Sequence, residues 1–367
     1  MDSGCRALIA ERIRRQGPIT VAEFMDLALY APEVGYYARA ARRSGRTGDF
    51  YTSVDTGPAF GALLAEHFAA YWRELGSGGQ GPARVDLVEA GAGDGRLTRD
   101  ILDAAARRDP AFYAAIAAHL VERSAEARAA HRAVLASHLP RLESSGEALP
   151  ADIDGIVFAN ELLDAFPVHL VEQGEAGLRE IYVDLEAARL VARPGPPSSP
   201  ALGEYLADAG VALAAGARAE INLAATNWVA VATARLRRGF LVLIDYGYEA
   251  AELYSEARAR GTLATYSRHV VDAPGDRGGP AWLADPGGRD LTSHVDVTSV
   301  RRAAERAGLD TVAVTPQTRF LLDVLDGSPL VAELSAPDRL ADRLALKTLL
   351  LPGGLGSTHT VMVFAKR

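Results

Sequence analysis

Several features that would point to particular classes of protein are missing from this sequence of 367 residues. A single cysteine, Cys5, excludes a disulfide framework or a cysteine-based zinc site within one chain. No apolar run approaches the roughly 20 residues of a membrane-spanning helix. The first residues mix acidic side chains with arginines and lack the apolar stretch of a signal peptide. We therefore expect a cytoplasmic protein without a membrane partner.

A net positive charge and the sequence patterns of metal sites are also missing. The formal net charge of −8 argues against a general nucleic-acid binder, which would carry a basic face. The eight histidines show neither an HExxH motif nor another paired metal spacing, so we expect no metal. With 49% hydrophobic residues, the chain can form one large domain or two modest ones.

The segment Val85–Gly95, with the sequence VDLVEAGAGDG, is the most informative part of the chain. An apolar strand runs into Glu89, and glycines follow at alternate positions, Gly91, Gly93 and Gly95. Glycine lets the backbone turn sharply and lets a ligand approach where a Cβ atom would clash. The next helix offers free N–H groups at its start. This pattern indicates a nucleotide-binding turn at the carboxyl end of the first strand of an α/β sheet.

The spacing of the glycines indicates which ligand is bound. A dinucleotide fingerprint requires G-x-G-x-x-G, but the sixth position counted from Gly91 is Arg96. A nicotinamide oxidoreductase is therefore disfavoured. The form E-x-G-x-G-x-G instead resembles motif I of class I S-adenosylmethionine (SAM) methyltransferases. The resemblance implies SAM contacts from Glu89, Gly91, Ala92, Gly93 and Gly95.

The rest of the chain alternates strands and helices, as a parallel α/β sheet requires. We expect strands at Val85–Glu89, His119–Glu122, Gly155–Ala159 and Phe240–Asp245, and a further short strand, which we do not place, between the second and third. We expect helices at Leu97–Ala106, Ala125–Ala136 and Val297–Ala307, and an added loop at Asp109–Ala114. Thr311–Thr315 and Thr360–Ala365 could close the sheet as a reversed hairpin.

The predicted domain organisation has two parts. Residues 1–82 form an N-terminal helical extension, in which Thr20 and Glu23 make a capping box. Residues 83–367 form the Rossmann-like methyltransferase domain, with insertions at about 166–225 and 249–293. Long irregular segments inside a compact domain are usually binding loops or lids. We therefore expect the extension and the insertions to bind substrate.

Polar residues at the ends of three strands are candidates for the site. Glu122 ends the second strand, where an acidic residue commonly accepts hydrogen bonds from ribose hydroxyls. In GIVFANELLDAFP, a strand delivers Asn160, Glu161 and Asp164 to its polar end. These acids could pair with a guanidinium, or Asn160 and Glu161 could simply cap a helix. Tyr246 follows Asp245 at a third strand end and could line a pocket.

His294 and Asp296, in DLTSHVD, form the remaining candidate pair. Such a pair could shuttle a proton. A single histidine in a loop before a helix is also often structural, so both interpretations stay open.

Taken in order along the chain, these motifs resemble the MidA-like SAM-dependent methyltransferases, which include the mitochondrial arginine methyltransferase of complex I assembly. The matching segments are ITVAEFMDLALYAPEVGYYA, GDFYTSVDTGPAFGALLA, VEAGAGDG, ANELLDAFPV, IDYGY, DLTSHVD, QTRFL and LPGGLGSTHTVMVFAKR. The resemblance implies a Rossmann-like core with an N-terminal helical extension. In motif I the family often has Pro–Gly–Arg–Gly where this chain has Ala92–Gly95, which reverses a charge beside the turn.

We therefore predict a SAM-dependent methyltransferase that acts on nitrogen or oxygen of a protein arginine or a small molecule. The alternative is a non-catalytic assembly or chaperone-like factor that retains the fold. Homodimer formation stays open. The predicted catalytic residues are Asp49, Glu161, Asp164 and His294. The predicted SAM contacts include Glu122 and Asn160 besides the glycine turn, and the predicted substrate contacts are Gly48, Phe50 and Tyr246.

Overall fold

The computed structural model describes residues 4–39, 52–267, 270–271, 279–325, 330, 333, 336, 339–351 and 355–367. Its contacts divide the chain into two compact units. The first unit comprises Met1–Phe50, Leu163–Trp228 and Gly247–Arg302, and the second comprises Tyr51–Leu162, Val229–Tyr246 and Ala303–Arg367. Residues 1–82 are thus shared between the units, while both predicted insertions fall in the first.

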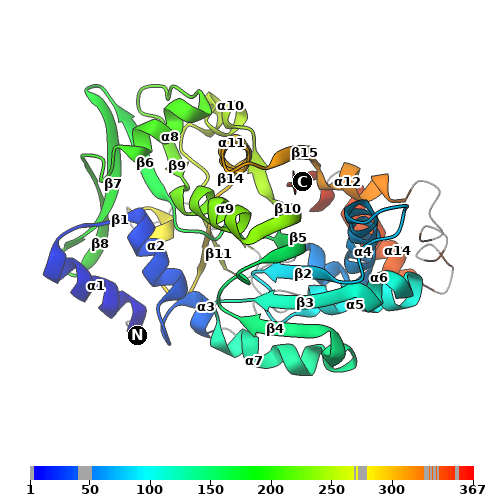
Figure 1. The fold of residues 1–367 in the computed structure, drawn as a ribbon. Coiled ribbons are helices and arrows are strands. Elements are labelled where there is room, and N and C mark those ends of the chain that lie inside the picture. The colour runs from blue at the N-terminus through cyan, green and yellow to red at the C-terminus, as the bar shows by residue number, and fades with distance from the viewer. Residues whose placement is uncertain are drawn as a thin grey trace. The chain divides into compact units, whose positions relative to one another are not determined.

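The second unit contains the large sheet, whose strands run in the order β15-β16-β10-β5-β2-β3-β4 (Figure 1). The strands from β10 to β4 pair in parallel, whereas β16 is antiparallel to both of its neighbours. This is the predicted class I methyltransferase sheet with its reversed closing hairpin. The bounds are β2 (Val85–Ala90), β3 (Ile116–Val121), β4 (Leu142–Gly146), β5 (Ile153–Asn160), β10 (Leu236–Tyr248), β15 (Asp310–Pro316) and β16 (His359–Lys366).

Helices of the second unit pack on this sheet and form one apolar core with it. A Cβ atom at Gly61 of α4 would lie 2.6 Å from the Cβ of Asp100 in α5, so glycine is what lets these two helices approach. The bounds are η1 (Ser53–Thr56), α4 (Pro58–Leu75), α5 (Arg96–Arg108), α6 (Pro110–Ala115), α7 (Ala125–Val134), η2 (Ala136–Arg141), α12 (Gln317–Asp323), α14 (Leu340–Leu350) and η5 (Leu355–Ser357).

The structure corrects two predictions near β3. The strand begins at Ile116 rather than His119, because the small apolar residues before His119 are buried in the sheet. The expected loop Asp109–Ala114 is instead the short helix α6, in which Pro110 occupies the first turn and Asp109 accepts a hydrogen bond from the Phe112 N–H (3.0 Å). The strand that the sequence did not place is β4.

The first unit contains a smaller, antiparallel sheet in the order β1-β7-β6-β9, with β8 paired to β7. Helices α1 and α2 share an apolar core with this sheet. The Thr20 hydroxyl caps α2 by accepting the Glu23 N–H (3.1 Å), but the Glu23 carboxylate pairs with Arg12, so only half of the predicted capping box forms. The sheet strands are β1 (Ile19–Thr20), β6 (His169–Gly174), β7 (Gly177–Glu186), β8 (Arg189–Gly195) and β9 (Arg218–Ile221).

The first unit also contains several short strands and helices. Three of the described elements continue from one unit into the other. Strands β11, β12 and β13 form a small antiparallel sheet, and β14 pairs with the end of β10. Helix α9 (Leu223–Arg235), strand β10 and helix α11 (Val297–Arg306) each run across a boundary between the units. The bounds are α1 (Gly4–Gln16), α2 (Val21–Tyr30), α3 (Tyr36–Arg39), α8 (Ala201–Ala209), α10 (Ala250–Leu253), η3 (Glu256–Arg258), β11 (Ala264–Ser267), β12 (Val270–Val271), η4 (Ala281–Leu283), β13 (Asp290–Thr292) and β14 (Val295–Asp296).

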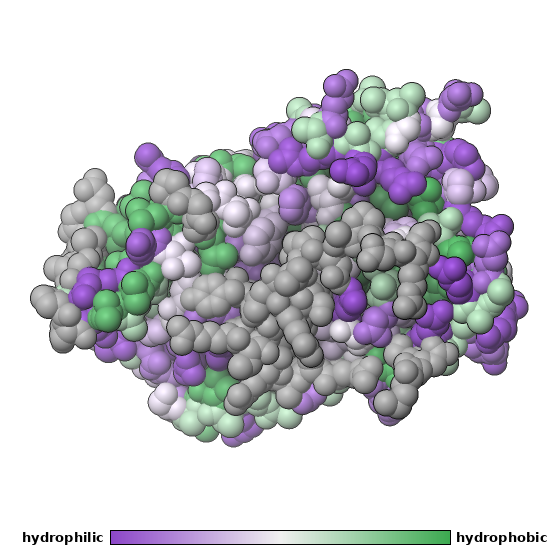
Figure 2. Space-filling view, turned by 180° about the vertical axis from the view of Figure 1, so that it is seen from behind, coloured by the Kyte–Doolittle hydropathy of each residue, from purple (hydrophilic) through white to green (hydrophobic). Residues whose placement is uncertain are grey.

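Hydrophilic and hydrophobic residues are interspersed over the coloured part of the face seen in Figure 2. Among the described residues, no helix is both long enough and apolar enough to cross a membrane.

Candidate active site

The glycine turn between β2 and α5 leaves room for a ligand. Gly91, Gly93 and Gly95 all have positive φ angles, of 72°, 53° and 88°. The N–H groups of Gly91 and Ala92 donate to the Val121 carbonyl, which ties the turn to the end of β3 (2.9 and 3.1 Å). A Cβ atom added at Gly93 would meet no atom of the described residues within 4 Å. Within the part of the chain that the structure describes, nothing therefore blocks a ligand from the backbone of Gly93.

Glu122, directly after β3, lies beside this turn. Its Oε2 accepts the Gly93 N–H (3.0 Å) and its Oε1 accepts the Ser124 N–H (2.7 Å). A carboxylate has about four lone-pair sites, so both oxygens keep capacity for a further donor. The predicted role of Glu122 toward the ribose hydroxyls is compatible with this position and stays a prediction.

Glu89, at the end of β2, points toward the first turn of α5. Its Oε2 accepts hydrogen bonds from the N–H of Thr98 (3.2 Å) and from the hydroxyl of the same residue. Burial raises the pKa of Glu89 to about 8, although these hydrogen bonds from Thr98 oppose the change. In this structure Glu89 therefore fixes the strand to the helix behind the glycine turn.

His131, which the sequence did not identify, supports the turn from α7. Its Nε2 lies 2.8 Å from the Gly93 carbonyl and its Nδ1 lies 2.8 Å from the Ser145 hydroxyl. The carbonyl only accepts, so Nε2 carries the proton and Nδ1 accepts from the hydroxyl. The side chain is fully buried. His131 thus holds the same peptide unit whose glycine faces the open space.

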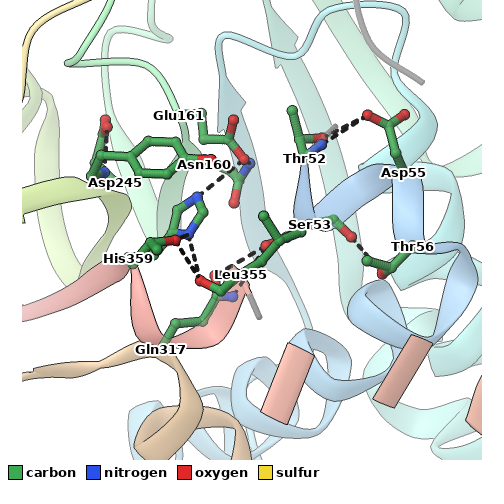
Figure 3. Close-up of polar contacts among 12 residues, drawn as sticks. Thr52, Ser53, Asp55, Thr56, Asn160, Glu161, Asp245, Gln317, Leu355 and His359 are labelled. Carbon is green, nitrogen blue, oxygen red and sulfur yellow. Dashed lines mark hydrogen bonds and ion pairs between the residues drawn. The ribbon is translucent and has the colours of Figure 1, made fainter. Parts of the chain in front are cut away.

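A second group of polar residues lies where β5 ends, and Figure 3 shows it with the start of β16. Glu161 has a φ of +52°, a left-handed conformation that is unusual outside glycine. The Nδ2 of Asn160 donates to Oε1 of Glu161 (3.3 Å). The Oδ1 of Asn160 is buried and accepts no hydrogen bond from any described residue. Such backbone strain is usually found where function requires a particular direction of the side chain.

His359, the first residue of β16, completes this group and was not identified from the sequence. Its Nε2 lies 3.3 Å from Oε1 of Glu161, and its Nδ1 lies 2.8 Å from the Leu355 carbonyl (Figure 3). Burial alone would lower the pKa of His359, but the hydrogen bond and charge of Glu161 raise it above its ordinary value. The only signal in the sequence was the terminal segment LPGGLGSTHTVMVFAKR, which contains this histidine.

Asp245 and Tyr246, at the end of β10, border the same group. Asp245 accepts the N–H of Leu162 through Oδ2 (3.1 Å), which holds the backbone just after Glu161. The rings of Tyr246 and His359 lie 3.9 Å apart between centroids. Tyr246, the predicted substrate contact, is therefore a direct neighbour of the Glu161–His359 pair.

The described part of the GDFYTS block connects to the glycine turn. Asp55 of η1 accepts the Thr52 N–H (3.0 Å) and pairs with Arg96, the first residue of α5 (3.0 Å). Ser53 of the same segment exchanges hydrogen bonds with buried Gln317 (Figure 3). The predicted residues Gly48, Asp49 and Phe50 lie outside the described residues.

Two predicted catalytic residues belong to the first unit. Asp164 is buried, and its carbonyl accepts the Ser293 N–H (3.0 Å). The N–H of His294 donates to the Thr262 hydroxyl (3.1 Å), and its Nδ1 is buried without a partner among the described residues. Burial lowers the pKa of His294, and the charge of Arg258 adds to this effect. The catalytic roles of Asp164 and His294 stay predictions.

Among the described residues, no group of three or more His, Cys, Asp or Glu is arranged to hold a metal ion.

Comparison with known proteins identifies the family. A model of S-adenosyl-L-methionine-dependent methyltransferases matches residues 63–315. The chain belongs to this methyltransferase family. A crystal structure of a superfamily member from Burkholderia thailandensis, bound to S-adenosyl-homocysteine, is 29% identical with a TM-score of 0.86, covering 100% of this chain and 92% of that one. These findings identify a SAM-dependent methyltransferase and do not favour the non-catalytic alternative.

Curated relatives of this methyltransferase include mitochondrial proteins. The protein arginine methyltransferase NDUFAF7 of Mus musculus is 28% identical over 330 residues, which are 80% of this chain and 68% of the relative. Its Drosophila melanogaster homolog is 28% identical over 332 residues, or 81% and 69% of the two chains.

The residues of the methyltransferase fit SAM. Bound SAM supplies a methyl group on a positively charged sulfur. The open space at Gly93 would admit its backbone-like methionine portion, and Glu122 offers lone pairs at the adjacent strand end. A Cβ atom at Gly93 would fill that space.

Proposed function

We propose that this methyltransferase acts on a guanidinium nitrogen of an arginine side chain in a protein. The observation that carries the proposal is the pair of acceptor atoms left at the end of β5. Oδ1 of Asn160 and Oε2 of Glu161 accept no hydrogen bond from the described residues. A guanidinium has five N–H donors and no acceptor, so it could donate to both of these oxygens.

The charges at this site also favour a cationic acceptor. The side chain of Glu161 is 14% exposed, so little water screens its carboxylate. Glu161 and Asn160 would orient the guanidinium and keep water away from it, and such positioning lowers the barrier to a displacement reaction. The acceptor nitrogen forms its bond to the methyl carbon while the carbon–sulfur bond breaks and leaves its electron pair on sulfur. The nitrogen also releases one proton, which Glu161 would receive.

The names of the curated relatives support the same acceptor, since they describe protein arginine methyltransferases. Those names also place the relatives in mitochondria. We propose the cytoplasm as the compartment of this methyltransferase, on its composition, and fractionation of cells that produce it would test this.

The acceptor is tested with methyl-labelled SAM and a cell extract, followed by acid hydrolysis and mass spectrometry of the labelled product. We expect label on methylated arginine. Glu161→Gln should lower the labelling rate roughly ten- to a hundredfold, because a hydrogen bond to a charged group contributes about 1.5–3 kcal/mol. Glu147→Gln, at an exposed residue of the same unit, is the matched control and should keep the parent rate. Label found only on a small molecule, or only in base-labile esters, would refute the arginine assignment.

A further inference from the structure

The surroundings of His359 restrict how its ring can be protonated. Nδ1 lies 2.8 Å from the Leu355 carbonyl, which has no proton to give, and 3.2 Å from the Thr358 hydroxyl, which itself donates to that carbonyl (2.9 Å). Nε2 faces Oε1 of Glu161 at 3.3 Å, and an ionised carboxylate only accepts. A neutral imidazole has one N–H and would therefore face either the Leu355 carbonyl or the Glu161 carboxylate with a lone pair. The imidazolium donates to both, so the contacts favour the doubly protonated ring.

Hydrogen bonds thus hold the Glu161 carboxylate through Oε1. Oε1 lies 3.3 Å from both the Asn160 amide and His359 Nε2. Oε2 accepts no hydrogen bond from the described residues. Glu161 has a left-handed backbone, a conformation that persists only where the surroundings hold it, so loss of these contacts should change the position of its carboxylate.

We infer that His359 is a positioning residue for methyl transfer, which in its protonated form holds Oε1 of Glu161 and so keeps Oε2 directed at the acceptor. This inference rests on the proposed function, in which Glu161 binds the acceptor.

The other surroundings of His359 act on its charge in different directions, since burial favours the neutral ring. The carboxylate of Asp245, one position along on the adjacent strand β10, also favours the imidazolium through its charge. The Tyr246 ring lies against the imidazole. The ring is completely buried, so water does not replace the contact with Glu161 when the proton leaves. Turnover should therefore fall as the pH rises through the raised pKa of His359.

Two substitutions separate positioning from a purely structural role. In His359→Gln the amide nitrogen takes the place of Nε2 and can still donate to Glu161. In His359→Asn it takes the place of Nδ1 and can donate only to Leu355. If His359 positions Glu161, the Gln variant keeps most of the turnover and loses the alkaline fall, while the Asn variant loses about tenfold or more at every pH, as expected for one hydrogen bond to a charged group.

SAM affinity is measured at each pH and should stay within about threefold of the parent, a change of less than 1 kcal/mol. His138→Gln is the matched control, because His138 is a buried histidine 3.0 Å from a carboxylate, that of Asp103, outside this site. It should keep the parent pH profile. Equal turnover in the Gln and Asn variants, or an unchanged alkaline fall in the Gln variant, would overturn the inference.

A second measurement does not need the acceptor. The titration of His359 is followed by NMR and assigned by its absence from His359→Gln. We expect its midpoint above the ordinary imidazole value of about 6.5 in the parent, and a lower midpoint in Glu161→Gln. An identical midpoint in both proteins would overturn the inference. If the parent methylates no arginine but the His359 midpoint is lower in Glu161→Gln than in the parent, the proposed acceptor is wrong and the Glu161–His359 pair stands.

Discussion

At the scale of single residues, Gly93 is the position at which ligand binding and backbone conformation can be separated. Gly93 and Gly78 have similar φ angles, 53° and 63°, and a Cβ atom at either would meet no described atom within 4 Å. Alanine at each should cost a similar free energy of unfolding, roughly 1–2 kcal/mol for the left-handed conformation. Of these two glycines, only Gly93 lies in the glycine turn that we predict to bind SAM.

We therefore expect Gly93→Ala to weaken SAM binding about tenfold or more in titration calorimetry, and Gly78→Ala to leave it unchanged. Both variants should lose similar stability in urea. An equal loss of SAM affinity in the two variants, or no loss in either, would contradict the placement of SAM at this turn.

Glu89 gives a prediction for stability against pH. Its pKa is about 8 in the folded protein, against 4.5 ordinarily, so the folded chain holds a proton that the unfolded chain has lost. The contribution to stability is complete below about pH 4.5 and is lost as the pH rises through about 8. In urea unfolding, the parent should lose stability over this range relative to Glu89→Gln, which cannot titrate. A constant difference between the two proteins across the range would show that Glu89 is ionised when folded.

At the scale of elements, the sequence was informative where a motif is contiguous. The turn between β2 and α5 could be predicted because strand, glycines and helix follow one another within a short stretch. The end of β5 could be predicted for the same reason. The periodicity of apolar residues likewise located most strands and helices, because strands and helices are set by residues close together in the sequence.

Contacts across long stretches of chain were not predictable in this way. His131 and Gly93 are 38 positions apart, and His359 and Glu161 are 198 apart. No spacing rule links such residues, because the packing of separate helices, strands and turns brings them together. The start of β3 was placed late for a related reason, since alanines before His119 have little strand propensity of their own and are held by burial between β2 and β4.

At the scale of the whole molecule, the two units have separate apolar cores but share regular elements. Helices α9 and α11 and strand β10 each run across a boundary, so unfolding of one unit disrupts elements of the other. We expect a single transition in scanning calorimetry. SAM at about 100 times its dissociation constant should raise the free energy of unfolding by about 2.7 kcal/mol and move the entire transition. Two transitions, of which SAM moves only one, would show that the units unfold independently.

The place of β16 in the sheet has a consequence for synthesis on the ribosome. β16 fills the position between β10 and β15, yet it follows β10 by about a hundred residues of chain. At roughly 5–20 residues per second, the edge of β10 stays unpaired for about 5–20 seconds after it is made. An open, apolar strand edge is a template for aggregation. Since β16 also carries His359, the nascent chain would complete the large sheet and the proposed acceptor site in the same late step.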